Sequence, residues 1–318
     1  MGYGIHNLGD FRGIPLSETA PDSFEGFAII EMDAITSGPN HWTERLDSDL
    51  FASYKEYWPM SHDQIGDVII VKIPKEISQF TQEIGRAMLN QHSNARIVCA
   101  DKGVKGKFRV RDLEVIKTMS DNSTRTKVKE HGNEFLTDPG LVYYSPRLAT
   151  ERLGTVEVAK RLSEKLGRKI SVCDPYAGVG PAVVPLTKIP EFVENIFASD
   201  LNPDAAELLG LNLPNSITKC ADARELSEDL GECCDLLLVN LPHEIVDHIP
   251  HIIGLLNRGH EVVIRGWAIL ESDLISKTEI EIRKHLSECQ VLSLEITPKK
   301  SYSSNISYVS IEAHLIRT

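Results

Sequence analysis

The feature that most constrains the fold of this sequence is the segment Asp-Pro-Tyr-Ala-Gly-Val-Gly at residues 174–180, which directly follows the apolar run 170–173. A buried strand that leads into a glycine turn and then a helix is where an open α/β sheet holds an adenosine ligand. Gly178 and Gly180 let the backbone pass close to the ligand, and amides of the turn and of the helix N-terminus face it. Pro181 stands where a first helical turn tolerates proline. The segment therefore predicts an adenosine pocket.

The residues that follow favour one adenosine compound over another. A second strand, residues 196–199, ends at Asp200, an acid placed to accept hydrogen bonds from ribose hydroxyls. A dinucleotide would require a third small residue at position 183, where Val183 would crowd the helix against the strand. S-adenosylmethionine has no diphosphate and needs no third glycine. We therefore expect S-adenosylmethionine, with a plain tight turn as the alternative. Asp222, after the strand 217–220, is placed either to accept from the adenine amino group or simply in a surface turn.

The alternation of patterns predicts the architecture of the second half. Strand and helix signals alternate between residues 155 and 264, which indicates a parallel sheet with crossover helices. Among them are an amphipathic helix at 155–166 that stops at Gly167, and a helix at 181–186. The segments 291–296 and 308–315 then pair as an antiparallel edge. We expect an α/β, Rossmann-like class I S-adenosylmethionine-dependent methyltransferase domain with a mostly parallel seven-stranded sheet over residues 139–318.

A small α+β domain is predicted ahead of it, over residues 56–138, after a poorly defined N-terminal element at 1–55. Its signals are a strand at 67–73, a helix at 77–90, and strands at 96–99 and 107–116. The chain has a net charge of −12, yet residues 94–129 hold 10 basic and 4 acidic side chains. This local excess suggests a patch aimed at phosphates, with a solvated face of alternating strands as the alternative.

Composition excludes several classes of protein. No run approaches the roughly 18 apolar residues of a membrane span, and residues 1–10 do not have the pattern of a secretory signal. The six cysteines form no C-x-x-C pair, and Cys233 and Cys234 are adjacent, which suits neither an ordinary disulfide nor a zinc knuckle. We expect free thiols, no metal cluster, and a cytoplasmic protein.

Asn240-Leu241-Pro242 follows the apolar strand 235–239, at the edge where open α/β sheets bind ligands. A side-chain amide and backbone carbonyls there can hold a planar heterocycle by its donors. A simple strand-to-loop turn is the alternative reading.

Five motifs occur together and in order: Lys-Gly-Lys-Phe-Arg-Val-Arg-Asp-Leu-Glu at 105–114, Tyr-Ser-Pro-Arg-Leu-Ala-Thr-Glu-Arg at 144–152, Ala-Gly-Val-Gly-Pro at 177–181, Asp-Leu-Asn-Pro at 200–203 and Asn-Leu-Pro at 240–242. In this combination the chain closely resembles the archaeal and eukaryotic tRNA (guanine(37)-N1)-methyltransferases, the Met-10+ like group, from about residue 60 onward. The resemblance implies methyl transfer from S-adenosylmethionine to N1 of the guanine beside the tRNA anticodon.

The resemblance also implies roles for individual residues. Guanine N1 carries a proton at neutral pH, and the base that removes it falls on Glu151. Arg109, with Arg111 as the fallback, would stabilise the charge that develops on O6, and Asn240 and Pro242 would hold the guanine edge. The implied cofactor-binding residues are Asp174, Tyr176, Ala177, Gly178, Gly180, Asp200, Leu201, Asp222 and Asn240. The implied tRNA contacts are Lys105, Lys107, Arg109, Arg111, Arg147 and Tyr302.

The resemblance further implies help from magnesium, although no dedicated metal cluster is evident, and contact with the anticodon stem-loop by a monomer. Tyr176 replaces the usual phenylalanine, and Ser303-Ser304 replace the usual Ala-Pro after Tyr302. Three alternatives stay open. One is a wyosine-pathway enzyme that transfers the aminocarboxypropyl group, whose relatives lack Asn-Leu-Pro. The others are a non-catalytic RNA-binding relative and a small-molecule methyltransferase, which would leave the basic patch unexplained.

Overall fold

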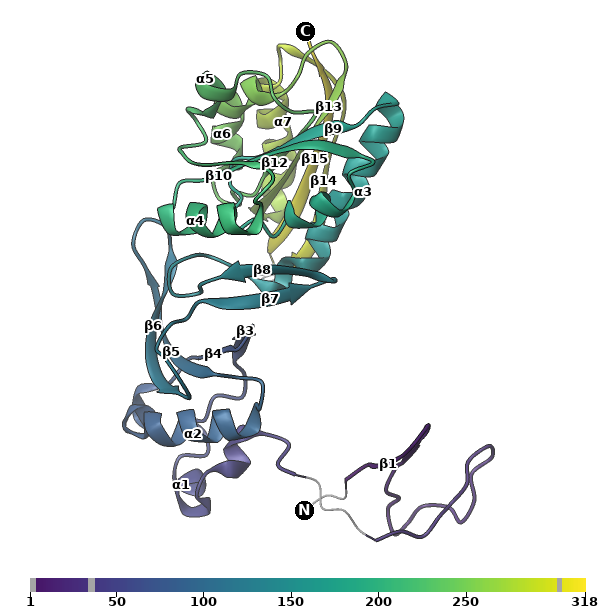
Figure 1. The fold of residues 1–318 in the computed structure, drawn as a ribbon, viewed down its shortest axis with the longest axis vertical. Coiled ribbons are helices and arrows are strands. Elements are labelled where there is room, and N and C mark those ends of the chain that lie inside the picture. Colours follow the sequence, from purple (N-terminus) through teal and green to yellow (C-terminus); the bar gives the residue numbers. More distant parts are fainter. Residues whose placement is uncertain (1–3, 34–37, 302–304) are drawn as a thin grey trace. The chain divides into compact units, whose positions relative to one another are not determined.

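The computed structural model describes residues 4–33, 38–301 and 305–318 in two compact units (Figure 1). The first unit consists of residues 1–63, 69–100 and 114–122, and the second of residues 64–68, 101–113 and 123–318. Within the described ranges, no helix combines the length and the apolar character needed to cross a membrane.

The second unit is built on a seven-stranded sheet with the order β11-β10-β9-β12-β13-β15-β14. Its strands are β9 (Ile170–Asp174), β10 (Val193–Asp200), β11 (Ile217–Cys220), β12 (Leu236–Val239), β13 (Glu261–Glu271), β14 (Cys289–Ser301) and β15 (Ile306–Arg317). The first five strands of this order are parallel, whereas β15 runs antiparallel to both β13 and β14. The predicted class I methyltransferase sheet with its antiparallel edge is therefore confirmed.

Helices cover both faces of this sheet (Figure 1). They are α3 (Ala149–Leu166), α4 (Pro203–Asn212), α5 (Leu226–Leu230), α6 (Ile245–Ile252) and α7 (Ile275–His285), with short 3₁₀ helices at Pro146–Leu148, Val184–Lys188, Ile253–Leu255 and Ser272–Leu274. The core on one face joins Leu226, Ile249 and Ile282 from α5, α6 and α7 to strand residues. Helix α3 packs on β9 and β13 from the other face, and it ends at Gly167 in the left-handed conformation (φ 65°), as predicted.

The predicted helix at 181–186 is wrong. The segment after the glycine turn consists of turns and the 3₁₀ helix Val184–Lys188. Pro185 has no amide hydrogen to donate, and Pro190 stops any continuation, so a long α-helix cannot form there. The ligand-facing backbone at this point is therefore the turn itself.

A hairpin that the sequence analysis did not predict precedes the sheet. It pairs β7 (Thr126–Glu130) with β8 (Asn133–Thr137) through a turn in which His131 and Gly132 both have positive φ, 48° and 76°. The Asn212 side chain at the end of α4 holds β8, since it accepts from the Leu136 amide (2.8 Å) and donates to the Leu136 carbonyl (2.9 Å). The alternation of residues 126–137 around His-Gly was the available signal.

The first unit has its own core. Its sheet has the order β3-β4-β5-β6, with β3 (Asp63–Ile65), β4 (Val68–Val71), β5 (Ile97–Lys105) and β6 (Val110–Thr118). Residues 64–65 of β3, Val68 of β4, and residues 101–113 at the ends of β5 and β6 that face their shared turn belong to the second unit. Its helices are α1 (Ser48–Ser53), α2 (Thr81–Gln91) and 3₁₀ helices at Trp42–Arg45 and Lys75–Phe80. Trp42, Ile77 and Ile84 are fully buried together.

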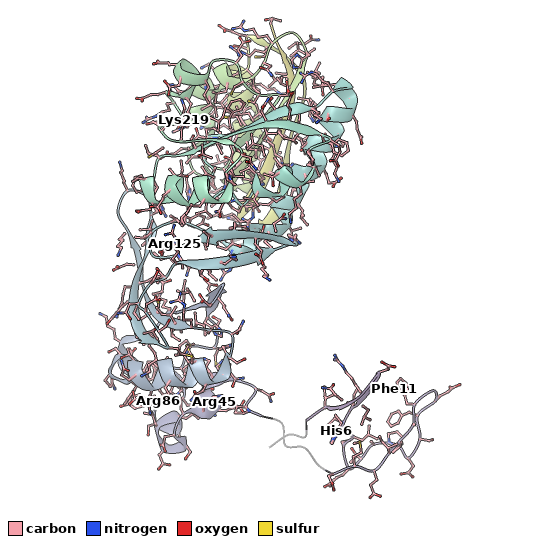
Figure 2. The ribbon with its side chains drawn as sticks, in the orientation of Figure 1. His6, Phe11, Arg45, Arg86, Arg125 and Lys219 are labelled. Atoms are coloured by element: carbon pink, nitrogen blue, oxygen red, sulfur yellow. The ribbon has the colours of Figure 1, made fainter. Side chains whose placement is uncertain are left out.

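The N-terminal part of this unit is a short hairpin of β1 (His6–Leu8) and β2 (Phe11–Gly13). His6 and Phe11 lie on these strands in Figure 2, and Phe11 is 76% exposed. Arg45, in the same view, donates from Nε to Gln91 Oε1 at 2.7 Å, which ties the first 3₁₀ helix to the end of α2.

Candidate active site

The glycine turn lies at the carboxyl end of β9, the middle one of the five parallel strands of the sheet. Gly178 (φ 57°) and Gly180 (φ 88°) both occupy the left-handed region, where a side chain would strain the backbone. A Cβ on Gly180 would also lie 2.9 Å from Leu209 Cδ1, whereas one on Gly178 would meet only the Tyr143 carbonyl at 3.8 Å. Packing requires the second glycine, and open space above the first leaves its backbone accessible to a ligand.

Two carboxylates flank this turn, of which Asp174 is buried and Asp200 half-buried. Asp200, at the end of β10, accepts the Gly178 amide at 2.8 Å and the Asn202 amide at 2.9 Å. Asp174 accepts the Tyr176 amide at 3.1 Å and is 1% exposed. Burial raises the pKa of Asp174 to about 7, and the neighbouring Asp200 adds to this increase; burial also raises the pKa of Asp200. A cationic ligand would relieve the cost of burying such carboxylates.

Tyr176 and Asp222 each contact a polar residue that the sequence analysis did not single out. The Tyr176 hydroxyl lies 2.8 Å from His248 Nδ1 on α6. The Arg224 side chain donates from Nε to Asp222 at 3.0 Å, and these hydrogen bonds lower the pKa of Asp222 to about 2. Asp222 is therefore ionised and engaged by Arg224, and an adenine amino group would share it.

The Asn240-Leu241-Pro242 segment lies where β12 ends, beside the next parallel strand. Val239 is the register partner of Gly266, so Asn240 comes beside Trp267 of β13. The Pro242 carbonyl accepts the Ile269 amide at 2.9 Å, which holds the loop against the same strand. Asn240 itself is half-buried. The segment is therefore held in one position at the carboxyl edge of the sheet.

Glu151 reaches this edge from the first turn of α3. The Trp267 indole Nε1 donates to Glu151 Oε2 at 3.5 Å, so the carboxylate lies against β13, adjacent to the strand that carries Asn240. The Glu151 side chain is 20% exposed. A half-buried carboxylate with room for a further hydrogen bond can accept a proton from a ligand held at this edge.

Sequence reasoning missed the residues that hold Glu151. Arg265 is 6% exposed; its Nη1 pairs with Glu312 Oε2 at 2.7 Å, and its Nη2 donates to the Glu151 carbonyl at 3.5 Å. A Cβ on Gly154 would lie 2.5 Å from Arg265 Nη2. A glycine in the interior of an otherwise regular helix was the available signal, because it costs stability unless something packs against it.

Four of the six predicted tRNA contacts, Lys105, Lys107, Arg109 and Arg111, lie on the β5–β6 hairpin. Arg109 is exposed in its turn, with φ 52° and its amide donating to the Gly106 carbonyl at 3.2 Å. Lys105 pairs with Asp112 at 2.8 Å and Arg111 with Asp101 at 3.4 Å, and Lys107 lies over the Phe108 ring at 4.7 Å. Within the described part of the chain, no hydrogen bond or ion pair joins Arg109 to Glu151 or Asn240. Their convergence on one guanine stays a prediction.

The remaining predicted residues lie near the glycine turn or in the segment before α3. The Ala177 amide donates to the Ser199 carbonyl at 2.9 Å, which joins the turn to β10, while Leu201 is 46% exposed beside it. Arg147 is exposed in the 3₁₀ helix before α3. Tyr302 lies outside the described residues. In Figure 2, Arg125 marks the segment before β7, where its guanidinium pairs with Glu207 at 2.9 Å, and Lys219 marks β11 at the sheet edge.

These residues fit S-adenosylmethionine better than a dinucleotide. The turn offers an open glycine backbone at Gly178, and Asp174 is a buried carboxylate that favours a cation, which the sulfonium compound carries. Val183 is fully buried behind the turn, and the turn does not lead into a long helix whose N-terminus could cradle a diphosphate.

Comparisons with known proteins agree with this geometry. Residues 126–297 match the family described as TRM5/TYW2 methyltransferase domain, and residues 42–117 match the TYW2 N-terminal domain. The tRNA (guanine(37)-N(1))-methyltransferase Trm5b of Pyrococcus abyssi is 32% identical over 270 residues, which are 83% of this chain and 76% of that protein. Trm5b of Methanocaldococcus jannaschii is 31% identical over 277 residues, 79% of this chain and 75% of that protein. The structure of aTrm5 in complex with tRNALeu superposes with a TM-score of 0.68 at 26% identity, over 99% of this chain and 92% of that one.

Proposed function

Because this chain belongs to the TRM5/TYW2 methyltransferase family, we propose that it transfers methyl from S-adenosylmethionine to N1 of guanine 37 in tRNA. The observation that carries the proposal is the position of the Glu151 carboxylate, held by Trp267 next to the strand end that bears Asn240. A carboxylate that can accept a proton, next to a strand end whose amide can read a base edge, supports this proposal. The two Trm5b relatives named above act, by their names, on this same position.

The chain's own residues would divide the work as follows. Asn240 and the backbone up to Pro242 orient the guanine, which must leave its stack to be reached. Glu151 takes the N1 proton onto its free carboxylate oxygen while Trp267 holds the other oxygen, a contribution of about 10²–10⁴-fold. Arg109 would balance the negative charge that grows on guanine O6. Asp174, Asp200 and the glycine turn would hold the cofactor, which would supply an electrophilic methyl group.

Several finer points are part of the proposal. We propose that the basic hairpin holds the anticodon stem-loop and that the enzyme acts as a monomer. We also propose that it acts in the cytoplasm, and the six free cysteines support this location. Help from magnesium is kept as a prediction, to be tested by adding a chelator to the transfer assay. Light scattering of the protein with and without tRNA measures its mass and so tests whether it is a monomer.

The nearest alternative is transfer of the aminocarboxypropyl group, since the matching family covers both TRM5 and TYW2 proteins. An unmodified tRNA transcript and, separately, tRNA that carries the tricyclic wyosine precursor should be incubated with cofactor labelled either in the methyl or in the carboxyl carbon, and the modified nucleotide mapped by mass. We expect methyl label alone, at guanine 37. Carboxyl label in the tRNA would instead establish the alternative.

The role of Glu151 is tested with two matched variants of α3. Glu151→Gln should lower the methyl-transfer rate by about 10²-fold or more, because glutamine cannot accept the proton, while tRNA binding stays unchanged. Glu157→Gln is the control, because Glu157 is exposed on the same helix and pairs only with Lys160 among described residues (3.5 Å). Equal rates for both variants would remove Glu151 from the mechanism.

A further inference from the structure

Three cysteines from two segments meet beneath the glycine turn. The Sγ atoms of Cys173, Cys233 and Cys234 all lie within 4.8 Å of one another. Cys173 and Cys234 are 1% and 0% exposed, while Cys233 is half-buried and gives the cluster an open side. The sequence analysis predicted free thiols and no metal cluster, because the cysteines form no C-x-x-C pair. Cys173 stands 60 positions before Cys233, so no ligand spacing links them.

The backbone holds these thiols in place. Leu237 of β12 is the register partner of Cys173, and the Asp235 amide donates to the Ser171 carbonyl at 2.8 Å. The amides of Cys233 and Cys234 both donate to the Leu255 carbonyl, at 2.8 and 3.1 Å. The cluster is thus part of the sheet framework, so that little conformational entropy would be lost when it binds a ligand.

The spacing suits a shared ion better than a disulfide. A metal bonded to three thiolates at about 2.3 Å sets the sulfur atoms roughly 4 Å apart, within the span seen here. A disulfide needs about 2.05 Å, and adjacent cysteines are hindered further because their Cα atoms are only about 3.8 Å apart. Closing a bond between buried thiols would require the core to move.

The surroundings determine which ions the cluster could take. Leu226, Leu237 and Leu255 belong to the same apolar core as Cys173 and Cys234. Thiolate ligands in an apolar setting select soft ions such as Cu⁺ and Zn²⁺ over Mg²⁺. We infer that Cys173, Cys233 and Cys234 form a three-thiolate site for a soft, thiophilic metal ion. Because Cys173 directly precedes Asp174, a bound ion would brace the strand that supports the glycine turn.

The test is a titration of the reduced full chain with Cd²⁺, a spectroscopic probe for thiolate sites, followed by its thiolate-to-metal charge-transfer absorbance. We expect saturation at one ion per chain, release of more than one proton per ion, and a raised unfolding temperature. Cys233→Ser should weaken binding by roughly tenfold or more. Cys220→Ser, which removes an exposed cysteine outside the cluster, should bind like the parent chain.

Two outcomes would overturn the inference. The first is an absorbance that rises without saturation, or a release of no more than one proton per bound ion. Either result would mean that Cd²⁺ binds to single, separate thiols. The second is undiminished binding in Cys233→Ser, whatever the behaviour of Cys220→Ser. Circular dichroism of Cys233→Ser and Cys233→Ala verifies folding, and the proton count on the parent chain decides the matter even if both variants unfold.

Discussion

At the scale of single residues, the site depends on small side chains that leave room for charged ones. Gly154 lets the Arg265 guanidinium approach α3, and Arg265 in turn holds the backbone of Glu151 while Trp267 holds its carboxylate. Arg265 is itself neutralised by Glu312 at 2.7 Å. The proposed base is thus oriented by residues more than 100 positions away in the sequence.

Gly154→Ala should therefore destabilise the protein although alanine favours helices. The added Cβ would lie 2.5 Å from Arg265 Nη2, and such overpacking costs about 1–3 kcal/mol against a propensity gain of about 1 kcal/mol. The matched control is Gly210→Ala in α4, whose Cβ would make an ordinary 3.5 Å contact with Thr218 Oγ1 and should stabilise. Thermal unfolding measures both. A Gly154→Ala variant as stable as Gly210→Ala would contradict the packing argument.

The buried Asp174 should make cofactor affinity depend on pH. Its folded pKa of about 7 exceeds the ordinary 3.8, so the stability of the ligand-free protein falls between those two values as pH rises and is constant above. A cationic cofactor favours the ionised form, so its affinity should rise by up to about tenfold per pH unit up to pH 7 and then level off. Calorimetric titration measures this dependence.

Asp174→Asn should bind the cofactor more weakly and without this pH dependence. Asp229→Asn, which alters an exposed acid paired with Lys219 at 3.1 Å, should keep the parent profile. If Asp174→Asn keeps the slope below pH 7, another group is responsible.

At the scale of elements, the start of α3 is joined to the β7–β8 hairpin by a buried ion pair. Arg152 donates to Glu130 from Nε at 2.7 Å and to the Ser145 carbonyl at 3.0 Å, and the Tyr144 hydroxyl donates to the same Glu130 at 2.9 Å. Both charged side chains are 8% exposed. This contact determines where the first turn of α3, and with it Glu151, lies against the sheet.

Removal of one partner should be costly. Glu130→Ala would leave Arg152 buried without its counter-charge, and we expect the free energy of unfolding to fall by about 3–5 kcal/mol. Glu134→Ala, on the same hairpin, removes an exposed ion pair with Lys129 (2.9 Å). This variant should change the free energy of unfolding by less than about 1 kcal/mol. Urea unfolding compares the two variants, and similar losses would mean that the buried pair does not anchor α3.

At the scale of the whole molecule, an acidic protein is proposed to bind an acidic polymer. The net charge is −12, so tRNA binding must depend on where the cations are. On the β5–β6 hairpin, Lys105 and Arg111 have acidic partners in the same hairpin, whereas Lys107 lies over the Phe108 ring. The hairpin is thus a pre-arranged surface whose ion pairs would exchange for phosphates.

Affinity for tRNA should therefore fall steeply with added salt. Lys107→Glu should weaken tRNA binding. It should also make the slope of log affinity against log salt concentration shallower, by the amount that corresponds to the loss of about one phosphate contact or more. Lys284→Glu, which changes an exposed lysine of α7 by the same charge, is the control. Filter binding over a salt series measures both; equal slopes for the two variants would place the tRNA elsewhere.

Local patterns in the sequence were enough for the parts of this protein that depend on neighbouring residues. The glycine turn, the acid that ends β10, the stop of α3 at Gly167 and the antiparallel edge all follow from periodicity and backbone preference, which act over a few residues. The helix predicted at 181–186 was wrong for the same local reason, since Pro185 and Pro190 were given too little weight.

Only the tertiary structure decided which distant residues meet. Trp267 contacts Glu151 across 116 positions, and Cys173 joins Cys233 and Cys234, because the sheet order brings β9, β12 and β13 side by side in one register. Sheet order results from the packing of the whole domain, and no short segment encodes it. The sequence by itself therefore determined the kind of pocket, while the long-range register of the sheet decided how its reactive side chains are held.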